Sequence, residues 1–244
     1  VSVTNEISNG NYSDEFVIDI FQTGSGTSTN MNMNEVIANI AAEKSGGQRG
    51  DKSIIHPNDH VNLGQSSNDV IPTAIHLALI ESIQTKLIPS MNMMADELNT
   101  KSNEFKDVIK TGRTHLQDAT PITLGQEFHG YYGQITKGIE KLTDSNKWLS
   151  EVALGGTAVG TGINTHEEFS KLVCEEISNE LGFEIKETDN HFQAQSTIDA
   201  VTATAGIIKS ISFCIIKSLS FSKSLKSILI FFAIEFVPAL PGKQ

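Results

Sequence analysis

Apolar residues recur at intervals of three and four along most of the chain, a spacing typical of helices with one apolar face. This spacing predicts five helices, which begin near Met33, Asp69, Leu124, Glu167 and Ala194. One short run, Phe16–Gln22, resembles a strand in composition. Long amphipathic helices joined by polar loops favour a mostly α fold, built as a long-helix bundle.

Two prolines mark the long helix that begins near Asp69. Pro72 is expected in its first turn, where the missing N–H of proline costs nothing. Pro89 lies farther along and is expected to kink or divide the helix, after which the apolar spacing resumes. The helix from Leu124 is expected to end near Leu149.

The segment GQSSND, residues 64–69, precedes this long helix with more polar side chains than one N-cap requires. The first backbone N–H groups of a helix lack partners, and the helix dipole favours negative charge at that end. Serine and asparagine would add hydrogen-bond donors there without adding charge. The segment therefore predicts a helix cap, an anion site, or both together.

The other polar loops carry little information when each is taken alone. Thr23–Glu35 combines glycines with hydroxyl and amide side chains, which are also common in turns. HPNDH, residues 56–60, fits no standard zinc spacing, so we expect a proline-started turn and no metal. His115, in GRTHLQDA, would by itself be read as a solvated loop histidine.

Composition narrows the class of protein. With 39% hydrophobic and 19% charged residues among 244, the chain can bury a sizeable core. Its net charge of −11 argues against a nucleic-acid partner. Cys174 and Cys214 show no metal or redox spacing, and Val1–Tyr12 does not resemble a signal peptide, so we expect a cytoplasmic protein. The apolar run Ile228–Leu240 is too short to span a bilayer, so no membrane partner is expected.

Five motifs stand in a fixed order: TGSGTSTNMNMNE, HPNDHVN, GQSSND, GRTHLQDATPITLGQE and LGGTAVGTGINTH. Together they resemble the class II fumarases of the fumarase/aspartase superfamily over about residues 15–205. The resemblance implies an all-α long-helix bundle, here incomplete at both ends. It also implies a homotetramer whose active sites combine loops from three subunits, and reversible hydration of fumarate to L-malate without a metal or organic cofactor.

The resemblance assigns roles residue by residue. It implies a catalytic role for His115 on the water or hydroxyl side of the substrate, with Thr114 beside it, both reaching the site from another subunit. His56, Asn58 and Asp59 resemble a secondary dicarboxylate site of the family, although Ser53 stands where the family has a basic residue. The expected substrate-binding residues are Ser25, Thr27, Ser66, Ser67, Asn68 and Thr114.

The resemblance also exposes a difference from the family. The family's general base is a serine in a mobile loop of the form GSSxMPxKxN, and no such segment occurs in this chain. The expected division is therefore 1–65 as part of an N-terminal domain with the substrate loop, 66–212 as the central helical bundle domain, and 213–244 as a divergent or truncated tail. The chain as given is expected to be inactive.

Two alternatives stay open. An aspartate ammonia-lyase has the same fold, but aspartases typically carry Gln where this chain has His115. A non-catalytic helical protein, such as the lens crystallins of the superfamily, would fit the absence of the serine loop. Turnover of fumarate distinguishes an enzyme from a non-catalytic protein.

Overall fold

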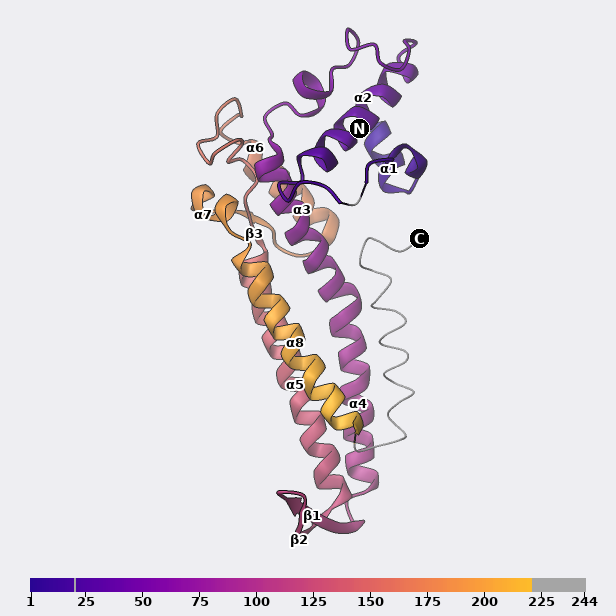
Figure 1. Ribbon diagram of the computed structural model, residues 1–244, viewed down its shortest axis with the longest axis vertical. Coiled ribbons are helices and arrows are strands. Elements are labelled where there is room, and N and C mark those ends of the chain that lie inside the picture. The colour runs from indigo at the N-terminus through magenta and orange to yellow at the C-terminus, as the bar shows by residue number, and fades with distance from the viewer. Residues whose placement is uncertain (20, 221–244) are drawn as a thin grey trace. The chain divides into compact units, whose positions relative to one another are not determined.

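The computed structural model describes residues 1–19 and 21–220, with side chains as far as residue 215. Helices account for most of these residues (Figure 1). Cα packing divides the chain into two compact units, Val1–Ala78 with Leu149–Ile198, and Leu79–Trp148 with Asp199–Gln244. The mostly α, long-helix prediction is confirmed.

The first unit is built around α2 (Thr27–Lys44), against which the N-terminal helix α1 (Ser2–Ser8) packs. Val3, Val36 and Ile40 form the buried cluster between them. Two short parallel strands, β3 (Glu151–Val152) and β4 (Lys186–Glu187), pair with each other and so join more distant parts of this unit. Its other elements are η1 (Ser13–Glu15), η2 (Pro57–Val61), the start of α3 (Ser67–Ser82), α6 (Phe169–Leu181) and α7 (His191–Ser196).

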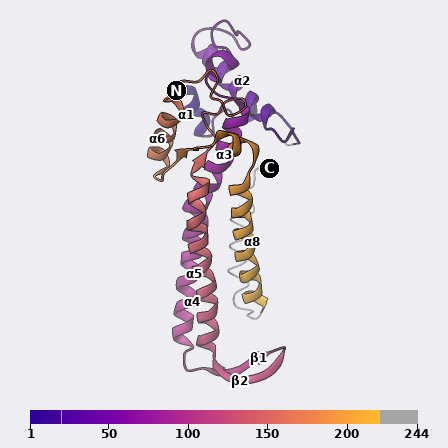
Figure 2. The same ribbon diagram turned by 90° about the vertical axis from the view of Figure 1, so that its left-hand side faces the viewer.

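The second unit is a packed set of long helices, α4 (Ile88–Glu104), α5 (Leu124–Leu149) and α8 (Asp199–Ser220), which lie side by side (Figure 2). A methyl group built on Gly138 would lie only 3.0 Å from Ile211 Cγ1 and 3.1 Å from Met91 Cε. Glycine at this position therefore lets the three helices approach closely. The hairpin β1 (Ile109–Thr114) and β2 (Gln117–Thr123) joins α4 to α5.

The amphipathic pattern places some helix boundaries well and others poorly. α5 spans the predicted Leu124–Leu149. α2 begins at Thr27, so the expected start near Met33 is too late. The first turns of α2 carry hydroxyl and amide side chains, and these give no apolar periodicity to detect. The helix expected from Ala194 is two helices, α7 and α8.

One of the two proline predictions needs correction. Pro72 lies beyond the first turn of α3, because that helix already begins at Ser67. The α-helix is divided directly before Pro89, as expected: α3 ends at Ser82, and a π-helical turn, η3 (Ile83–Leu87), leads into α4. The wider π turn accommodates the carbonyl of Thr85, with which the proline ring would clash in a regular α-helix.

The strand predictions also differ from the structure. The described residues of Phe16–Gln22 form no strand. The polar loop around His115 is instead a two-stranded antiparallel hairpin. Most residues of its strands are exposed, and the one buried position, Gly112, has no side chain, so the sequence lacks the alternation that a half-buried strand would show.

The expected division at residues 65 and 212 stays a prediction about functional domains, whereas the compact units each gather two separate stretches of chain. Of the tail 213–244, residues 221–244 lie outside the described residues, and so does the apolar run Ile228–Leu240. Within the described ranges, no helix is long and apolar enough to cross a membrane.

Candidate functional site

The start of α3 is closed by a reciprocal cap. Ser66 Oγ accepts a hydrogen bond from the backbone N–H of Asn68 at 3.2 Å, and Asp69 Oδ1 accepts one from the N–H of Ser66 at 2.9 Å. This is a capping box with aspartate in place of the usual glutamate. Ser66 and Asp69 therefore provide the cap, and Ser67 and Asn68 are the additional polar residues of GQSSND.

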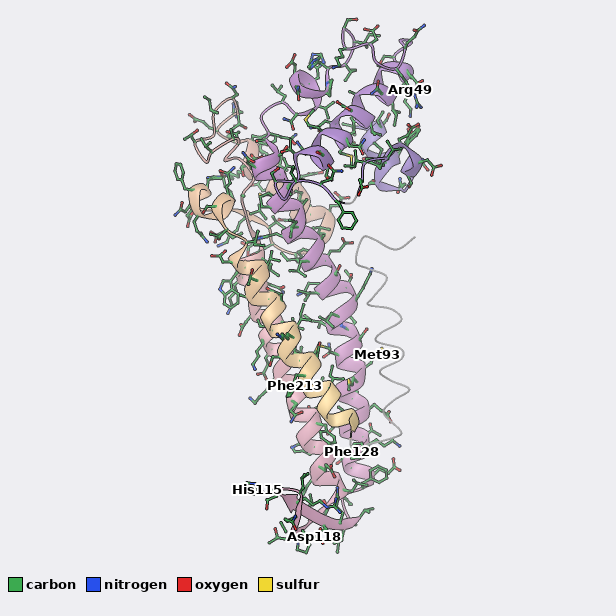
Figure 3. All side chains as sticks on the ribbon, in the orientation of Figure 1. Arg49, Met93, His115, Asp118, Phe128 and Phe213 are labelled. Carbon is green, nitrogen blue, oxygen red and sulfur yellow. The ribbon has the colours of Figure 1, made fainter. Side chains whose placement is uncertain are left out.

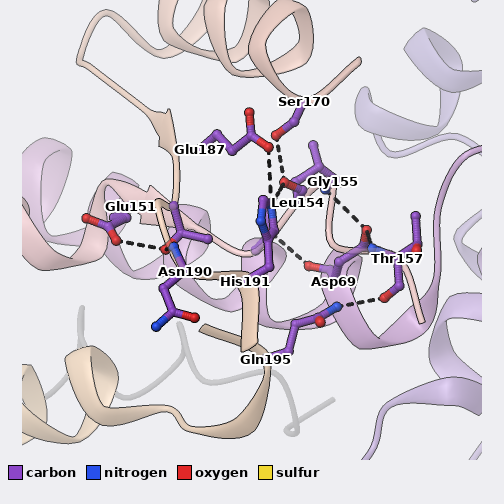
Figure 4. Close-up of polar contacts among 12 residues, drawn as sticks. Asp69, Glu151, Leu154, Gly155, Thr157, Ser170, Glu187, Asn190, His191 and Gln195 are labelled. Carbon is purple, nitrogen blue, oxygen red and sulfur yellow. Dashed lines mark hydrogen bonds and ion pairs between the residues drawn. The ribbon is translucent and has the colours of Figure 1, made fainter. Parts of the chain in front are cut away.

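Asp69 also connects α3 to the glycine-rich loop of residues 154–166. Its other oxygen, Oδ2, accepts hydrogen bonds from the N–H of Gly155 at 3.2 Å and of Thr157 at 2.8 Å (Figure 4). Asp69 is completely buried. Burial raises the pKa of this carboxyl group, and the hydrogen bonds from Ser66, Thr157 and Gly155 oppose that rise. The sequence marked Asp69 as a helix-start residue and gave no signal of this second role.

Asn68 contacts the same loop. Its Nδ2 donates to the carbonyl oxygen of Ala158 at 2.7 Å. The loop has the conformation to meet it because Gly155 and Thr157 both adopt positive φ, 99° and 54°. Such a φ is uncommon for a β-branched residue, so the contacts of Thr157 with Asp69 and Gln195 hold it in a costly conformation.

The far side of the glycine-rich loop is fixed by side chains from α6 and α7 (Figure 4). Ser170 Oγ donates to the carbonyl of Leu154 at 2.6 Å, and His191 Nε2 lies 3.1 Å from the same oxygen. His191 Nε2 also lies 3.2 Å from Glu187 Oε1, and Gln195 Nε2 donates to the carbonyl of Thr157 at 2.6 Å. The loop is thus a rigid wall beside the start of α3.

The start of α2 lies against the start of α3. Gly26, with φ of 70°, precedes α2, and a methyl group built on it would lie 2.8 Å from Ile71 Cγ2. Only glycine permits both this conformation and this approach. A hydrogen bond from Asn30 Nδ2 to Ser67 Oγ, 3.0 Å long, joins the two helices directly.

Hydroxyl groups surround the start of α2. Ser25 Oγ lies 3.1 Å from Thr23 Oγ1 and 3.2 Å from Thr27 Oγ1. Among the residues that the structure describes, no side chain caps the first N–H groups of this 18-residue helix. The structure therefore brings together two helix N-termini that carry five predicted substrate residues: Ser25, Thr27, Ser66, Ser67 and Asn68. Neutral donors and two helix dipoles suit an anionic ligand.

The remaining predicted residues, Thr114 and His115, belong to the second unit and not to this cluster. His115 and Leu116 form the two-residue turn of the hairpin, with φ of 49° and 63° (Figure 3). Both positive φ values indicate a type I′ turn, which favours Asn-Gly. Histidine and leucine carry side chains that disfavour positive φ, so the backbone of this turn is strained. Backbone strain of this kind is often found at functional positions. Both residues are exposed.

The HPNDH segment forms a π-helical turn, and His56 caps it. Nδ1 of His56 accepts hydrogen bonds from the N–H groups of Asn58 at 3.3 Å and Asp59 at 3.1 Å. His60 Nδ1 accepts one from the N–H of His56 at 2.9 Å. Both rings therefore have a donor only at Nε2. The proline-started turn is confirmed, and His56 has one nitrogen left for a ligand. Among the residues that the structure describes, no group of three or more His, Cys, Asp or Glu side chains could hold a metal ion.

The chain is similar to known proteins in sequence and in structure. A family model described as "Lyase" matches residues 1–220. The class II fumarate hydratase of Halobacterium salinarum is 55% identical over 201 residues, which are 82% of this chain and 43% of that protein. That of Nitrosomonas europaea is 49% identical over 217 residues, which are 89% of this chain and 47% of that protein. The chain thus spans less than half the length of either relative.

Two solved structures are similar to this chain over most of its length. The class II fumarase of Schistosoma mansoni matches with a TM-score of 0.83 and 37% identity, over 88% of this chain and 48% of that chain. A Brucella melitensis protein called "fumarate lyase:delta crystallin", bound to cobalt, matches with a TM-score of 0.85 and 41% identity, over 93% of this chain and 49% of that one.

Proposed function

We propose, because the chain belongs to the lyase family whose model matches residues 1–220, that the full-length protein carrying this sequence hydrates fumarate reversibly to L-malate. The observation that supports this most strongly is the joining of the α2 and α3 starts by Gly26, Ile71 and the Asn30–Ser67 hydrogen bond. The resulting cluster offers neutral donors to a dicarboxylate. Relatives named class II fumarate hydratase are 49–55% identical to this chain over the aligned residues, which make up less than half of each relative.

The chemistry explains why such donors are needed. Removing a proton beside a carboxylate leaves an aci-carboxylate, which carries extra negative charge on its oxygens. Donors already aimed at those oxygens stabilise this charge without reorganising during the reaction. Ser67, Asn68, Ser25 and Thr27 are the proposed donors in this chain.

His115 is the proposed acid–base group for the hydroxyl side of the substrate. An imidazole can give and take a proton near neutral pH, so it can assist hydroxide departure and water attack. We propose that the hairpin carries Thr114 and His115 to a site on another subunit of a homotetramer. The exposed, strained tip supports this, since a turn without a function would favour Asn-Gly.

Two finer assignments remain proposals. We propose a cytoplasmic location, supported by cysteines without disulfide spacing, although a Rhizopus oryzae relative is named a mitochondrial fumarate hydratase. We also propose that His56, Asn58 and Asp59 form a secondary dicarboxylate site. In that site His56 would donate through Nε2, because Nδ1 accepts hydrogen bonds from the backbone.

Removing one donor should impair substrate use more than folding. In the full-length protein, Ser67→Ala and Asn68→Ala are each expected to lower kcat/KM for fumarate about 10- to 150-fold, since a hydrogen bond to a charged group contributes about 1.5–3 kcal/mol. Steady-state kinetics and thermal unfolding measure the two effects. Asn103→Ala is the control, because Asn103 is an exposed asparagine of α4 whose side chain donates to the carbonyl of Asn99, one turn earlier. Unchanged kinetics in both variants would place the substrate elsewhere.

Water, and not ammonia, is the expected second substrate. With equal fumarate and added ammonium, the full-length protein is expected to form malate and no measurable aspartate, because His115 stands where aspartases typically carry Gln. Product analysis by chromatography measures both. His115→Gln is the matched variant and should lose malate formation. Aspartate as the main product would instead assign the protein to the ammonia-lyases.

A further inference from the structure

Two asparagines are buried on the side of α2 that faces the start of α3. Asn30 is 6% exposed and Asn34 is 5% exposed. A buried amide costs free energy unless its donors and acceptor are satisfied. Both Nδ2 groups donate to the same atom, Asn62 Oδ1, at 3.2 Å from Asn30 and 3.0 Å from Asn34. The three amides therefore form one connected network.

The direction of this network is fixed by a backbone carbonyl. Asn62 Nδ2 donates to the carbonyl oxygen of Gln65 at 3.4 Å, and a carbonyl oxygen can only accept. Rotating the Asn62 amide by half a turn would set its oxygen against that carbonyl. Asn62 Oδ1 must therefore face Asn30 and Asn34, and both of these must present their Nδ2 hydrogens to it.

The direction continues from Asn30 to Ser67. One Nδ2 hydrogen of Asn30 is directed at Asn62, and the other at Ser67 Oγ, 3.0 Å away. Ser67 Oγ is consequently an acceptor on its inner side. Its own proton has to point away from Asn30, and within residues 1–19 and 21–215 it has no acceptor. A hydroxyl held in this way is a preset donor toward a ligand.

We propose that Asn30 is a positioning residue, which holds the Ser67 hydroxyl as a donor to one carboxylate of a dicarboxylate bound at the start of α3. This inference rests on the proposed function, because it assumes that an anionic substrate lies against Ser67. It specifies the direction of one hydrogen bond, in which Asn30 donates and Ser67 accepts. The network ends in the Ser67 hydroxyl, which points outward as a donor. It therefore favours an anionic ligand group, which accepts a hydrogen bond, over a ligand group that must itself donate.

An aspartate at position 30 would reverse that direction. A carboxylate has no hydrogen to give, so the Ser67 hydroxyl would turn inward and donate to it. The variant would also place a negative charge beside the anion site. Asn30→Ala removes the same hydrogen bond without adding charge, and therefore leaves Ser67 free to rotate.

The test is a double-mutant cycle on the affinity for fumarate, measured by calorimetry with the full-length protein. Asn30→Ala is expected to raise the Kd about three- to tenfold, and Asn30→Asp at least about tenfold, from the loss of an oriented hydrogen bond. In a Ser67→Ala background, Asn30→Ala should change the Kd less than about twofold, because the hydroxyl it positions is gone. Asn39→Asp adds the same charge farther along α2, where Asn39 bonds to Glu35 and Gly50, and should leave the Kd unchanged.

Three outcomes would count against the inference, the proposed function or both. If Asn30→Ala raises the Kd by the same factor with and without Ser67, Asn30 acts through general stability and the inference is wrong. If fumarate binds with the expected coupling but is not converted to malate, the inference stands and the proposed function fails. If fumarate does not bind to the unsubstituted protein, both fail.

Discussion

Replacing Asp69 with alanine is expected to destabilise the folded chain by about 3–5 kcal/mol, because three backbone N–H groups lose their acceptor. The side chain is completely buried and accepts hydrogen bonds from the N–H groups of Ser66, Gly155 and Thr157. Alanine would leave these three donors without an acceptor, and each costs about 1–3 kcal/mol when it stays buried. Relaxation and water entry recover part of that sum.

Urea unfolding of the full-length protein measures this loss. Asp144→Ala is the control, because Asp144 is exposed and its ion pair with Lys147 lies on the surface of the same helix, so its loss should stay within about 0.5 kcal/mol. Asp69→Asn tests the chemistry, since its amide keeps one acceptor and sets an NH₂ group against a backbone N–H. Its loss should lie between those of the alanine variant and the control. An Asp69→Ala variant that is as stable as the control would contradict the role of Asp69 as a buried link.

The difference in stability between the native chain and Asp69→Asn should depend on pH, and the direction of this dependence follows from the pKa of Asp69. Burial raises the pKa of Asp69 in the folded state above its ordinary value. The folded chain therefore binds more protons than the unfolded chain between the two pKa values. The stability contributed by Asp69 is fully present below the unfolded pKa and declines as pH rises through the folded pKa. The stability difference between the native chain and Asp69→Asn should accordingly shrink as pH rises through this acid range.

The sequence predicts those parts of the fold that depend on local periodicity. α5 follows from its apolar spacing because one face packs continuously against its neighbours. The start of α2 is missed because its buried face carries Asn30 and Asn34, which are polar and satisfied by distant amides. The hairpin around His115 is missed because main-chain hydrogen bonds hold it, and these leave no pattern in the side chains.

The candidate site divides in the same way. The polar excess in GQSSND is visible in the sequence, and the capping box accounts for half of it. The second contacts of Asp69 reach residues 86 and 88 positions away, and Asn30 meets Ser67 across 37 positions. No local pattern encodes such contacts, so only the folded chain reveals them. The roles of the substrate residues themselves stay predictions.

The 244-residue chain expressed alone is expected to hydrate fumarate at least about 10²- to 10⁴-fold more slowly than an intact class II fumarase, the factor that a positioned base contributes. The family's serine loop, GSSxMPxKxN, does not occur in its sequence. His115 cannot serve in its place, because acid and base act on opposite faces of the substrate in an anti elimination. The lysine and asparagine of that loop would also be missing as substrate contacts.

We also expect the 244-residue chain to assemble poorly into a defined tetramer. Met93 and Phe213, on α4 and α8, are 70% and 69% exposed, and such apolar side chains on long helices promote aggregation unless another surface covers them. The measurement follows fumarate absorbance after malate addition, with light scattering on the same soluble fraction. The full-length Nitrosomonas europaea relative is the positive control. A monodisperse tetramer with turnover near that of the control would overturn this expectation, and would show that the 244 residues contain a base outside the family's serine loop.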